Sequence, residues 1–303
     1  MNRLRAPIRL RICLLFFVAL TLTLLCSCER TSGTPSPPAE AQTAKLRIVS
    51  VGSAVTETLF ALGAGDSVVG VDSSSLFPEE AAKLPQVGYQ RTLAAEGILA
   101  LTPTMVLATA EAGPPAVLEQ LRSAGVRLET IGAEPTIDGV KQRIRRVAEM
   151  IGRDPSKVLA ELDADLTRAN AESIAAPTRP KVLVLYARGG NSLHVFGRNT
   201  AAETMVRLAG GENAVTGFDG TKPLTPEALA VAAPDVIVIP SRGLESVGGL
   251  DGLLNVPGIA STRAAKTKRI VAIDDLLLLG FGPRTGRAAL ELGAKLRSGA
   301  EAK

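Results

Sequence analysis

Beyond residue 28 this sequence contains no cysteine, and the whole chain has one histidine and no tryptophan. Without cysteine, this part of the chain cannot form disulfides or thiolate metal sites, so its stability must come from core burial. The single histidine, His194, excludes a histidine cluster for zinc and leaves at most one histidine-based catalytic triad. No Gly-x-Ser-x-Gly elbow is present either. The composition therefore does not favour an enzyme.

The sequence also has no apolar run long enough for a comfortable membrane span. Its longest run, Ile12–Leu25, has 14 residues, whereas a spanning helix needs about 20. This run follows a segment with four arginines and leads into Cys26-Ser27-Cys28. The pattern resembles a bacterial lipoprotein signal with Cys28 as the lipidated residue, although Cys26 is an unusual residue at its position. Ordinary secretion is the alternative, and in both cases the chain leaves the cytoplasm.

Excess charge is absent once this leader is set aside. The net charge of +4 equals the number of leader arginines, which leaves 30 basic residues against 30 acidic ones. A nucleic-acid binder should show a basic imbalance, so we expect no nucleic-acid partner. Residues 29–45 are rich in Pro, Ser, Thr and Ala without apolar periodicity. They are predicted to form a flexible tether.

One segment occurs twice. Leu93–Leu107 and Leu224–Val238 each have a glutamate that opens a short helix, a proline seven residues later and a β-branched run. These glutamates are Glu96 and Glu227. A repeat of this length predicts two similar lobes rather than a solenoid, and small ligands bind in clefts between lobes.

Strand and helix patterns alternate in both halves, which is typical of βα units on a parallel sheet. We expect an α/β fold with two Rossmann-like lobes, at residues 46–136 and 177–303. Residues 137–176 show no strand pattern and are predicted to form linking helices, the first capped by Asp138. The second linking helix is long enough to act as a rigid spine between the lobes.

Glu96 and Glu227 have two interpretations. An acidic residue in the first turn of a helix gains a few tenths of a kcal/mol from the helix dipole, which accounts for each glutamate singly. Repeat ancestry is one reason for finding both. Alternatively, one carboxylate on each lobe meets a basic socket on a two-fold symmetric partner.

Four segments together support a more specific assignment. They are Arg47–Glu57, Leu84–Leu99 with its Val-Gly-Tyr-Gln-Arg-Thr-Leu motif, Asn199–Glu203, and Asp274-Asp275 with Leu279–Pro283. In these segments the chain resembles class III periplasmic substrate-binding proteins of ABC importers, and within them the hemin-binding branch. The resemblance extends from Arg47 to the C-terminus. It implies that Glu96 and Glu227 contact arginines of a permease dimer in the inner membrane.

The resemblance also implies roles in ligand binding. The tyrosine that matches Tyr89 supplies a phenolate oxygen to ferric haem in related proteins, and a hard anionic oxygen suits Fe(III). Arg91 then steadies the phenolate or pairs with a haem propionate. Haem iron is the only metal that we expect. The alternative for Tyr89 is a packed residue in a hinge.

The sequence does not decide which residue, if any, is the second ligand of the haem iron. Some related proteins have a histidine where this chain has Arg188, so that ligand is lost here. His194 is one candidate replacement, and its alternative role is that of an ordinary strand residue. With Tyr89 as sole iron ligand, Arg188, Arg198 or Arg242 would bind the propionates.

The expected protein is therefore a haem receptor of the cell envelope, lipid-anchored or periplasmic, that delivers haem to an ABC importer without catalysing a reaction. The same fold carrying a corrinoid or a ferric siderophore is the nearest alternative. With either of these ligands, Tyr89→Phe would leave the binding affinity nearly unchanged. A two-lobed exported enzyme and a haem store without an importer are more distant alternatives.

Overall fold

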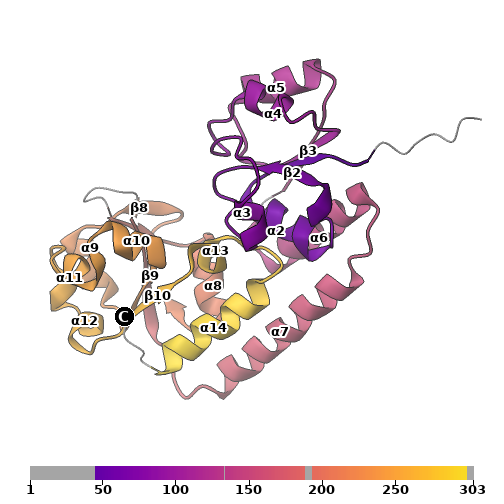
Figure 1. Cartoon of the computed structure of the whole chain (residues 1–303). Coiled ribbons are helices and arrows are strands. Elements are labelled where there is room, and N and C mark those ends of the chain that lie inside the picture. Colours follow the sequence, from indigo (N-terminus) through magenta and orange to yellow (C-terminus); the bar gives the residue numbers. More distant parts are fainter. Residues whose placement is uncertain (1–44, 133, 188–192, 299–303) are drawn as a thin grey trace, which may run out of the picture. The chain divides into compact units, whose positions relative to one another are not determined.

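The computed structural model describes residues 45–298, apart from 133 and 188–192 (Figure 1). In this part of the chain, each half contains one β-sheet. The leader, the tether and Cys28 lie outside the described residues. No helix among the residues described is both long and apolar enough to cross a membrane.

The sheet of the first lobe is parallel, and its strands lie in the order β2-β1-β3-β4. Its strands are β1 (Ile48–Val51), β2 (Val68–Val71), β3 (Met105–Thr109) and β4 (Arg127–Ile131). Its helices are α2 (Ser53–Ala61), η1 (Gly65–Ser67), α3 (Glu79–Ala82), α4 (Ala95–Leu99) and α5 (Pro115–Ser123). The strands β1, β2 and β3 read as short apolar runs because both faces of a parallel sheet are buried, whereas the edge strand β4 is partly exposed and carries Arg127 and Glu129.

The sheet of the second lobe is mixed. Its strands are β5 (Lys181–Ala187), β6 (Leu193–Phe196), β7 (Glu212–Asn213), β8 (Thr221–Pro223), β9 (Val236–Pro240) and β10 (Ile270–Ile273). They follow the order β10-β9-β5-β6-β8, and β7 also pairs with β5. The prediction of a parallel sheet holds for β5, β7, β9 and β10. In contrast, β6 and β8 add antiparallel pairing to this sheet, which the sequence did not indicate.

Helices surround this second sheet. They are α8 (Ala201–Leu208), α9 (Pro226–Ala232), α10 (Ser241–Ser246), α11 (Gly249–Leu254), η2 (Ile259–Ser261), α12 (Arg263–Lys266), α13 (Asp275–Leu279) and α14 (Thr285–Ser298). The start of α8 is capped by a side chain, because the Thr200 hydroxyl accepts from the Glu203 N–H at 3.1 Å. The Glu203 carboxylate accepts in turn from the Asn199 N–H at 2.7 Å. Both bonds fix the start of this helix.

Two helices connect the sheets, α6 (Ile137–Ile151) and α7 (Ser156–Ala175). The first packs on α2 and β4, whereas α7 packs on α14 and α8. The prediction that Asp138 caps α6 is wrong: the Thr136 hydroxyl accepts from the Gly139 N–H at 3.0 Å. Asp138 lies one position inside the first turn, where a negative charge still benefits from the helix dipole.

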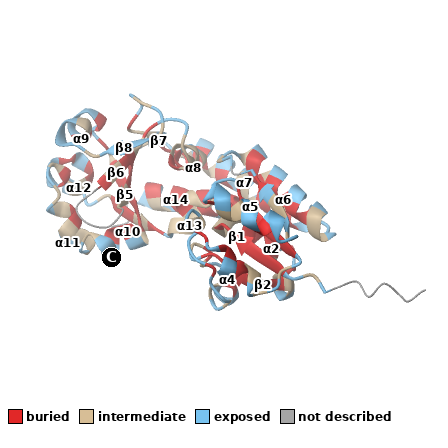
Figure 2. Cartoon of the chain, turned by 90° about the horizontal axis from the view of Figure 1, so that it is seen from above, coloured by how far each residue is buried: buried red, intermediate tan, exposed pale blue. Residues whose placement is uncertain are grey.

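Alternate residues of the strands enter different apolar clusters. The side chains of Ile48 and Met105 in the first sheet, and of Val182 and Val236 in the second, belong to one shared cluster that includes residues of α2, α6, α7, α8 and α14. The intervening strand residues enter a separate cluster in each lobe. Figure 2 shows β1 and β5 as buried, with exposed residues on the surrounding helices. The lobes are thus joined by a continuous core.

The predicted repeat is present, and it extends to individual hydrogen bonds. In each lobe a non-glycine residue of positive φ lies directly before the proline that follows the helix, Thr102 at 44° after α4 and Ala233 at 39° after α9. The side chain of the residue after that proline accepts from a backbone N–H next to the first strand of its lobe. These bonds join Arg47 to Thr104 at 2.9 Å and Lys181 to Asp235 at 3.0 Å.

A buried ion pair also connects the lobes. Glu57 on α2 is 6% exposed and accepts from the Arg284 backbone N–H at 3.0 Å and from its guanidinium at 2.8 Å. The guanidinium carbon lies 3.4 Å from the centre of the Phe77 ring. A charge at Glu57 is tolerated only because both its oxygens are paired. The segment before α14 is therefore fixed against the first lobe.

Candidate functional site

A cavity of about 310 Å³ is lined by residues of both lobes. From the first lobe come residues that follow β1 and β3, together with Gln90 and Arg91. From the second lobe come Ala201 and the segment Leu279–Phe281. In open α/β sheets, ligands bind beyond the carboxyl ends of the strands, and this cavity has that position in the first lobe.

One wall of the cavity is formed by the start of α2, where the backbone passes close to the side chain of Thr109. Gly52, between β1 and α2, has φ of 102°, and a Cβ there would lie 2.8 Å from a methyl group of Thr109. Only glycine fits this conformation without strain. The first turn of α2, with Ser53 and Ala54, lines the cavity and has no capping side chain. Its N–H groups give this wall a partial positive charge.

Tyr89 lies in a loop that is fixed by backbone hydrogen bonds. The Ser73 N–H donates to the Gly88 backbone carbonyl at 2.8 Å, and the Thr92 N–H donates to the Tyr89 backbone carbonyl at 2.8 Å. The Tyr89 side chain is 43% exposed, and its phenol has no hydrogen-bond partner among the residues described. Its neighbours Gln90 and Arg91 line the cavity, so the loop places Tyr89 beside the rim of the cavity.

His194 lies in β6, where its backbone is paired with Tyr186 of β5. Leu193 and Val195 are buried in the cluster of the second lobe, so His194 belongs to the opposite face of the hairpin. Its ring nitrogen Nδ1 is buried without a hydrogen-bond partner among the residues described. His194 is therefore a strand residue, as its alternative role required, but the ring nitrogen lacks the hydrogen bond expected of a purely structural histidine.

The candidate arginines of the second lobe differ in their surroundings. Arg198 forms an exposed ion pair with Asp219 at 2.9 Å. Arg242, at the start of α10, is exposed, and its backbone N–H donates to Asp275 at 3.3 Å. Burial and, to a smaller extent, Asp274 raise the pKa of Asp275, while Arg242 acts against this. Arg188 lies outside the described residues.

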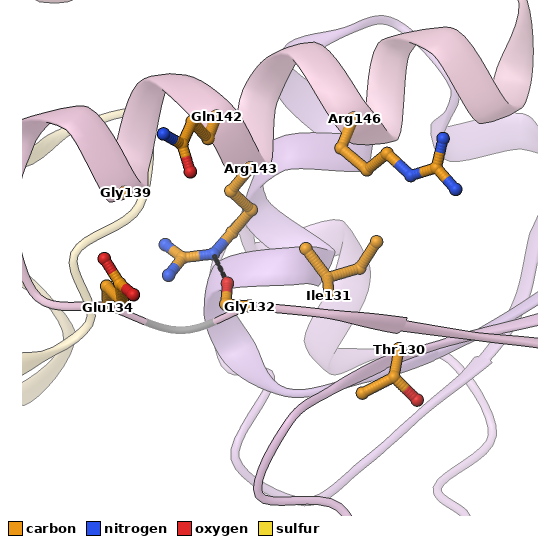
Figure 3. Close-up of a pocket in the computed structure, with 8 residues that line it drawn as sticks. All are labelled: Thr130, Ile131, Gly132, Glu134, Gly139, Gln142, Arg143 and Arg146. Atoms are coloured by element: carbon orange, nitrogen blue, oxygen red, sulfur yellow. Dashed lines mark hydrogen bonds between the residues drawn. The ribbon is translucent and has the colours of Figure 1, made fainter.

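One residue that sequence reasoning missed also lines the cavity. Arg143 of α6 is 4% exposed, and its Nε donates to the Gly132 carbonyl at 3.2 Å (Figure 3). Its Nη1 donates to the carbonyl of Phe281 in the other lobe. The signal was available, since Arg143 lies at helical spacing from the apolar residues Val140 and Val147.

Glu96 and Glu227 occupy the second position of α4 and of α9. Both are exposed, and neither forms an ion pair within the described part of the chain. Their environments differ: Thr225 caps α9, whereas no side chain caps α4. Val231, one turn after Glu227, is 87% exposed. Each lobe thus presents a free carboxylate at the same place in the repeat.

Two α/β lobes with a continuous core and a cavity between them define a small-molecule binding protein. The chain belongs to the periplasmic binding protein family, whose model matches residues 48–277.

Two solved structures and one curated relative illustrate its similarities. The periplasmic heme-binding protein RhuT from Roseiflexus sp. RS-1 is 46% identical, with a TM-score of 0.82 over 85% of this chain and 100% of that chain. The periplasmic heme-binding protein BhuT in complex with two hemes is 42% identical, with a TM-score of 0.79 over 84% of this chain and 98% of that chain. The vitamin B12-binding protein of Pectobacterium atrosepticum is 27% identical over 258 residues, which are 82% of this chain and 88% of the relative.

Proposed function

We propose that this protein binds ferric haem between its lobes and delivers it to an ABC importer of the inner membrane. The observation that carries the proposal is the Tyr89 loop. It presents an exposed phenol without a hydrogen-bond partner among the described residues, next to a cavity lined by Arg91. The similarity to heme-binding proteins, at up to 46% identity among those compared above, supports the same ligand.

In this proposal Tyr89 ligates the iron and Arg91 supports it. A phenolate is a hard oxygen donor, which matches Fe(III) and loses affinity when the iron is reduced. Arg91 is exposed at the cavity and carries a planar, permanently charged group that can hold a propionate with two hydrogen bonds. The protein performs no chemical step, and the shared core and the Glu57–Arg284 pair keep cleft closure small.

His194 is the proposed candidate for a second iron ligand, because its Nδ1 lacks a partner in the described part of the chain. If Tyr89 is the sole ligand, the cations of the second lobe supply propionate contacts instead. Arg242 is then more available than Arg198, because the latter is paired with Asp219. Arg188 belongs to the same set but lies outside the described residues.

Delivery requires a partner, and Glu96 and Glu227 are the proposed docking residues. Their matched positions on repeated helices suit a two-fold symmetric permease with one basic socket for each lobe. The leader supports attachment to the membrane through a lipid on Cys28. Mass spectrometry of the membrane-extracted protein tests this, since the alternative of ordinary secretion leaves no diacylglyceryl group.

Titration of the purified protein with hemin, cyanocobalamin and a ferric siderophore tests the function. We expect a saturable shift of the Soret band with hemin and no saturable binding of the other two. Saturable binding of cyanocobalamin without a hemin response would contradict the proposal and favour the corrinoid alternative. Tyr89→Phe also distinguishes haem from a corrinoid. The substitution should weaken haem binding, whereas a corrinoid does not need an oxygen ligand from the protein.

A further inference from the structure

Arg143 has an unusual combination of burial and charge. Its side chain is almost fully enclosed, but both its hydrogen-bond partners are neutral carbonyls, of Gly132 and Phe281. A guanidinium has five N–H groups, and these bonds use two of them. The others have no partner among the residues described, and no carboxylate there lies within ion-pair distance. No nitrogen of Arg143 is among the fully enclosed polar atoms that lack a partner, so its remaining N–H groups face solvent at the cavities, where an anion can take the place of water.

The surroundings of Arg143 favour an anion. The cavity between the lobes is lined by Arg143, by Arg91 and by the uncapped first turn of α2. Three carboxylates act against this. Asp72 is fully buried and accepts from the Gly52 N–H at 2.8 Å, directly before α2. Glu111 lines the same cavity and accepts from the Thr109 hydroxyl. Glu134 lines the neighbouring cavity of about 320 Å³, which also includes Arg143 (Figure 3).

The balance of charge at the cavity between the lobes is positive. Two arginines line it against the single carboxylate of Glu111, while Asp72 offsets the partial charge of the α2 N-terminus. Burial lowers the pKa of Arg143, with Glu111 acting in the opposite direction. An arginine nevertheless stays protonated at neutral pH, because its ordinary pKa lies far above neutrality. Arg146, three residues further along α6, points away from Arg143 and pairs with Glu149 at 2.8 Å (Figure 3).

We propose that Arg143, together with the first turn of α2, forms a carboxylate-binding subsite at the inner end of this cavity. Its occupant is a propionate of the bound haem, so the inference rests on the proposed function and adds to it. Arg143 bridges the lobes through its two carbonyl contacts, and a bound carboxylate would complete the hydrogen bonding of its guanidinium. The subsite would fix the orientation of the macrocycle relative to Tyr89.

The experiment compares hemin with hemin dimethyl ester, in which both carboxylates are methylated. Dissociation constants are measured by Soret titration for the wild type, Arg143→Met and Arg143→Lys. Arg145→Met is the matched control, since Arg145 is an exposed arginine of the same helix. The melting temperature of each protein without ligand is recorded, to detect a purely structural effect.

We expect the wild type to bind hemin at least tenfold more tightly than the ester. Arg143→Met should weaken hemin binding about tenfold and leave ester binding within twofold, whereas Arg145→Met changes neither. Arg143→Lys should retain part of the preference for hemin, because it keeps a positive charge. These changes concern the ratio of the two affinities, which a loss of stability alone does not alter.

Two results would overturn the subsite while leaving the haem proposal intact. One is equal affinity of the wild type for hemin and its ester, a result that needs no variant to fold. The other is an equal loss of both affinities in Arg143→Met, which would give Arg143 a structural role only. Absence of saturable hemin binding by the wild type would instead contradict the proposed function, and the propionate assignment with it.

Discussion

In the first lobe β2 runs along β1, whereas in the second lobe the corresponding edge of β5 is shared by β7 and β6. The parallel strands correspond in order, β2-β1-β3-β4 and β7-β5-β9-β10. The antiparallel pair β6 and β8 is the addition. It brings His194 opposite Tyr186 near the carboxyl end of β5. The first lobe instead places Tyr89 in the loop between α3 and α4.

This difference shows how a repeated fold acquires an asymmetric site. The strands, the helices α4 and α9 and the bonds at Thr104 and Asp235 are common to both lobes. Features shared in this way suit a symmetric partner. The residues at the cavity have no such correspondence, so they suit an asymmetric ligand. The predictions below test this division between shared and unshared features.

The largest expected effect concerns the connection between the lobes. Glu57→Ala leaves the Arg284 guanidinium partly buried without its carboxylate, and removing one partner of a buried ion pair costs about 3–5 kcal/mol. For a domain of this size we expect a fall in melting temperature of about 6–12 °C. Glu161→Ala is the control, because its pairing with Lys157 at 3.9 Å is fully exposed to solvent on a helix surface. Calorimetry should show one transition for each protein; two would contradict a shared core.

The next effect concerns the shared glutamates. Glu96→Arg or Glu227→Arg should reduce haem transport into vesicles that contain the importer at least tenfold, since each places a cation against a basic socket. Hemin affinity should not change. Glu80→Arg, at an exposed position in the first turn of α3, is the control. Normal transport by the double variant would exclude these docking sites and leave a haem store without an importer.

A smaller effect compares the cations of the two lobes. Arg91 lines the cavity, whereas Arg242 does not. Losing a charge-assisted hydrogen bond at an exposed rim costs about 0.5–1.5 kcal/mol, so Arg91→Met should weaken hemin binding about two- to tenfold. Arg242→Met should change it less than twofold. If the order of the two effects is reversed, the second lobe holds the exposed propionate.

The smallest effect is a pH dependence in the second lobe. Because burial raises the pKa of Asp275, its ionised form reduces stability at neutral pH, and this loss is relieved as the pH falls through the raised pKa. Asp275→Asn should therefore melt slightly higher than the wild type at pH 7, by about 1–2 °C for a half-exposed group. The gap should close in acid, as followed by thermal melts from pH 7 to 4. A gap that widens in acid would contradict this sign.

Much of the fold was predictable, because its determinants are local. A β-branched run after a proline-terminated helix gave β3 and β9, and the same pattern gave α4 and α9. The strand β8 was missed because Thr221–Pro223 is polar and too short to show alternation, and the antiparallel pairing of β6 had no local signal. The position of Tyr89 next to a cavity followed from a motif, and the loop around it was predicted as a loop.

The parts that escaped prediction depend on contacts between distant residues. Glu57 and Arg284 are 227 positions apart, and neither carries a local signal of pairing. The spacing of Arg143 from Val140 and Val147 indicates a place on the buried face of its helix, but nothing local indicates its partner, the carbonyl of Phe281, 138 positions away. Thr136 and Asp138 are both residue types that cap helices, so the sequence alone could not decide which of them caps α6.

The most direct test of the account asks which lobe holds the iron. The protein has two tyrosines, Tyr89 in the first lobe and Tyr186 in the second, so the same substitution can be made in each. Visible spectra of the hemin complexes of the wild type, Tyr89→Phe and Tyr186→Phe are compared. We predict tyrosinate charge-transfer bands in the wild type and in Tyr186→Phe, and their loss in Tyr89→Phe. Bands that persist in Tyr89→Phe and disappear in Tyr186→Phe would contradict the account and assign the iron to the second lobe.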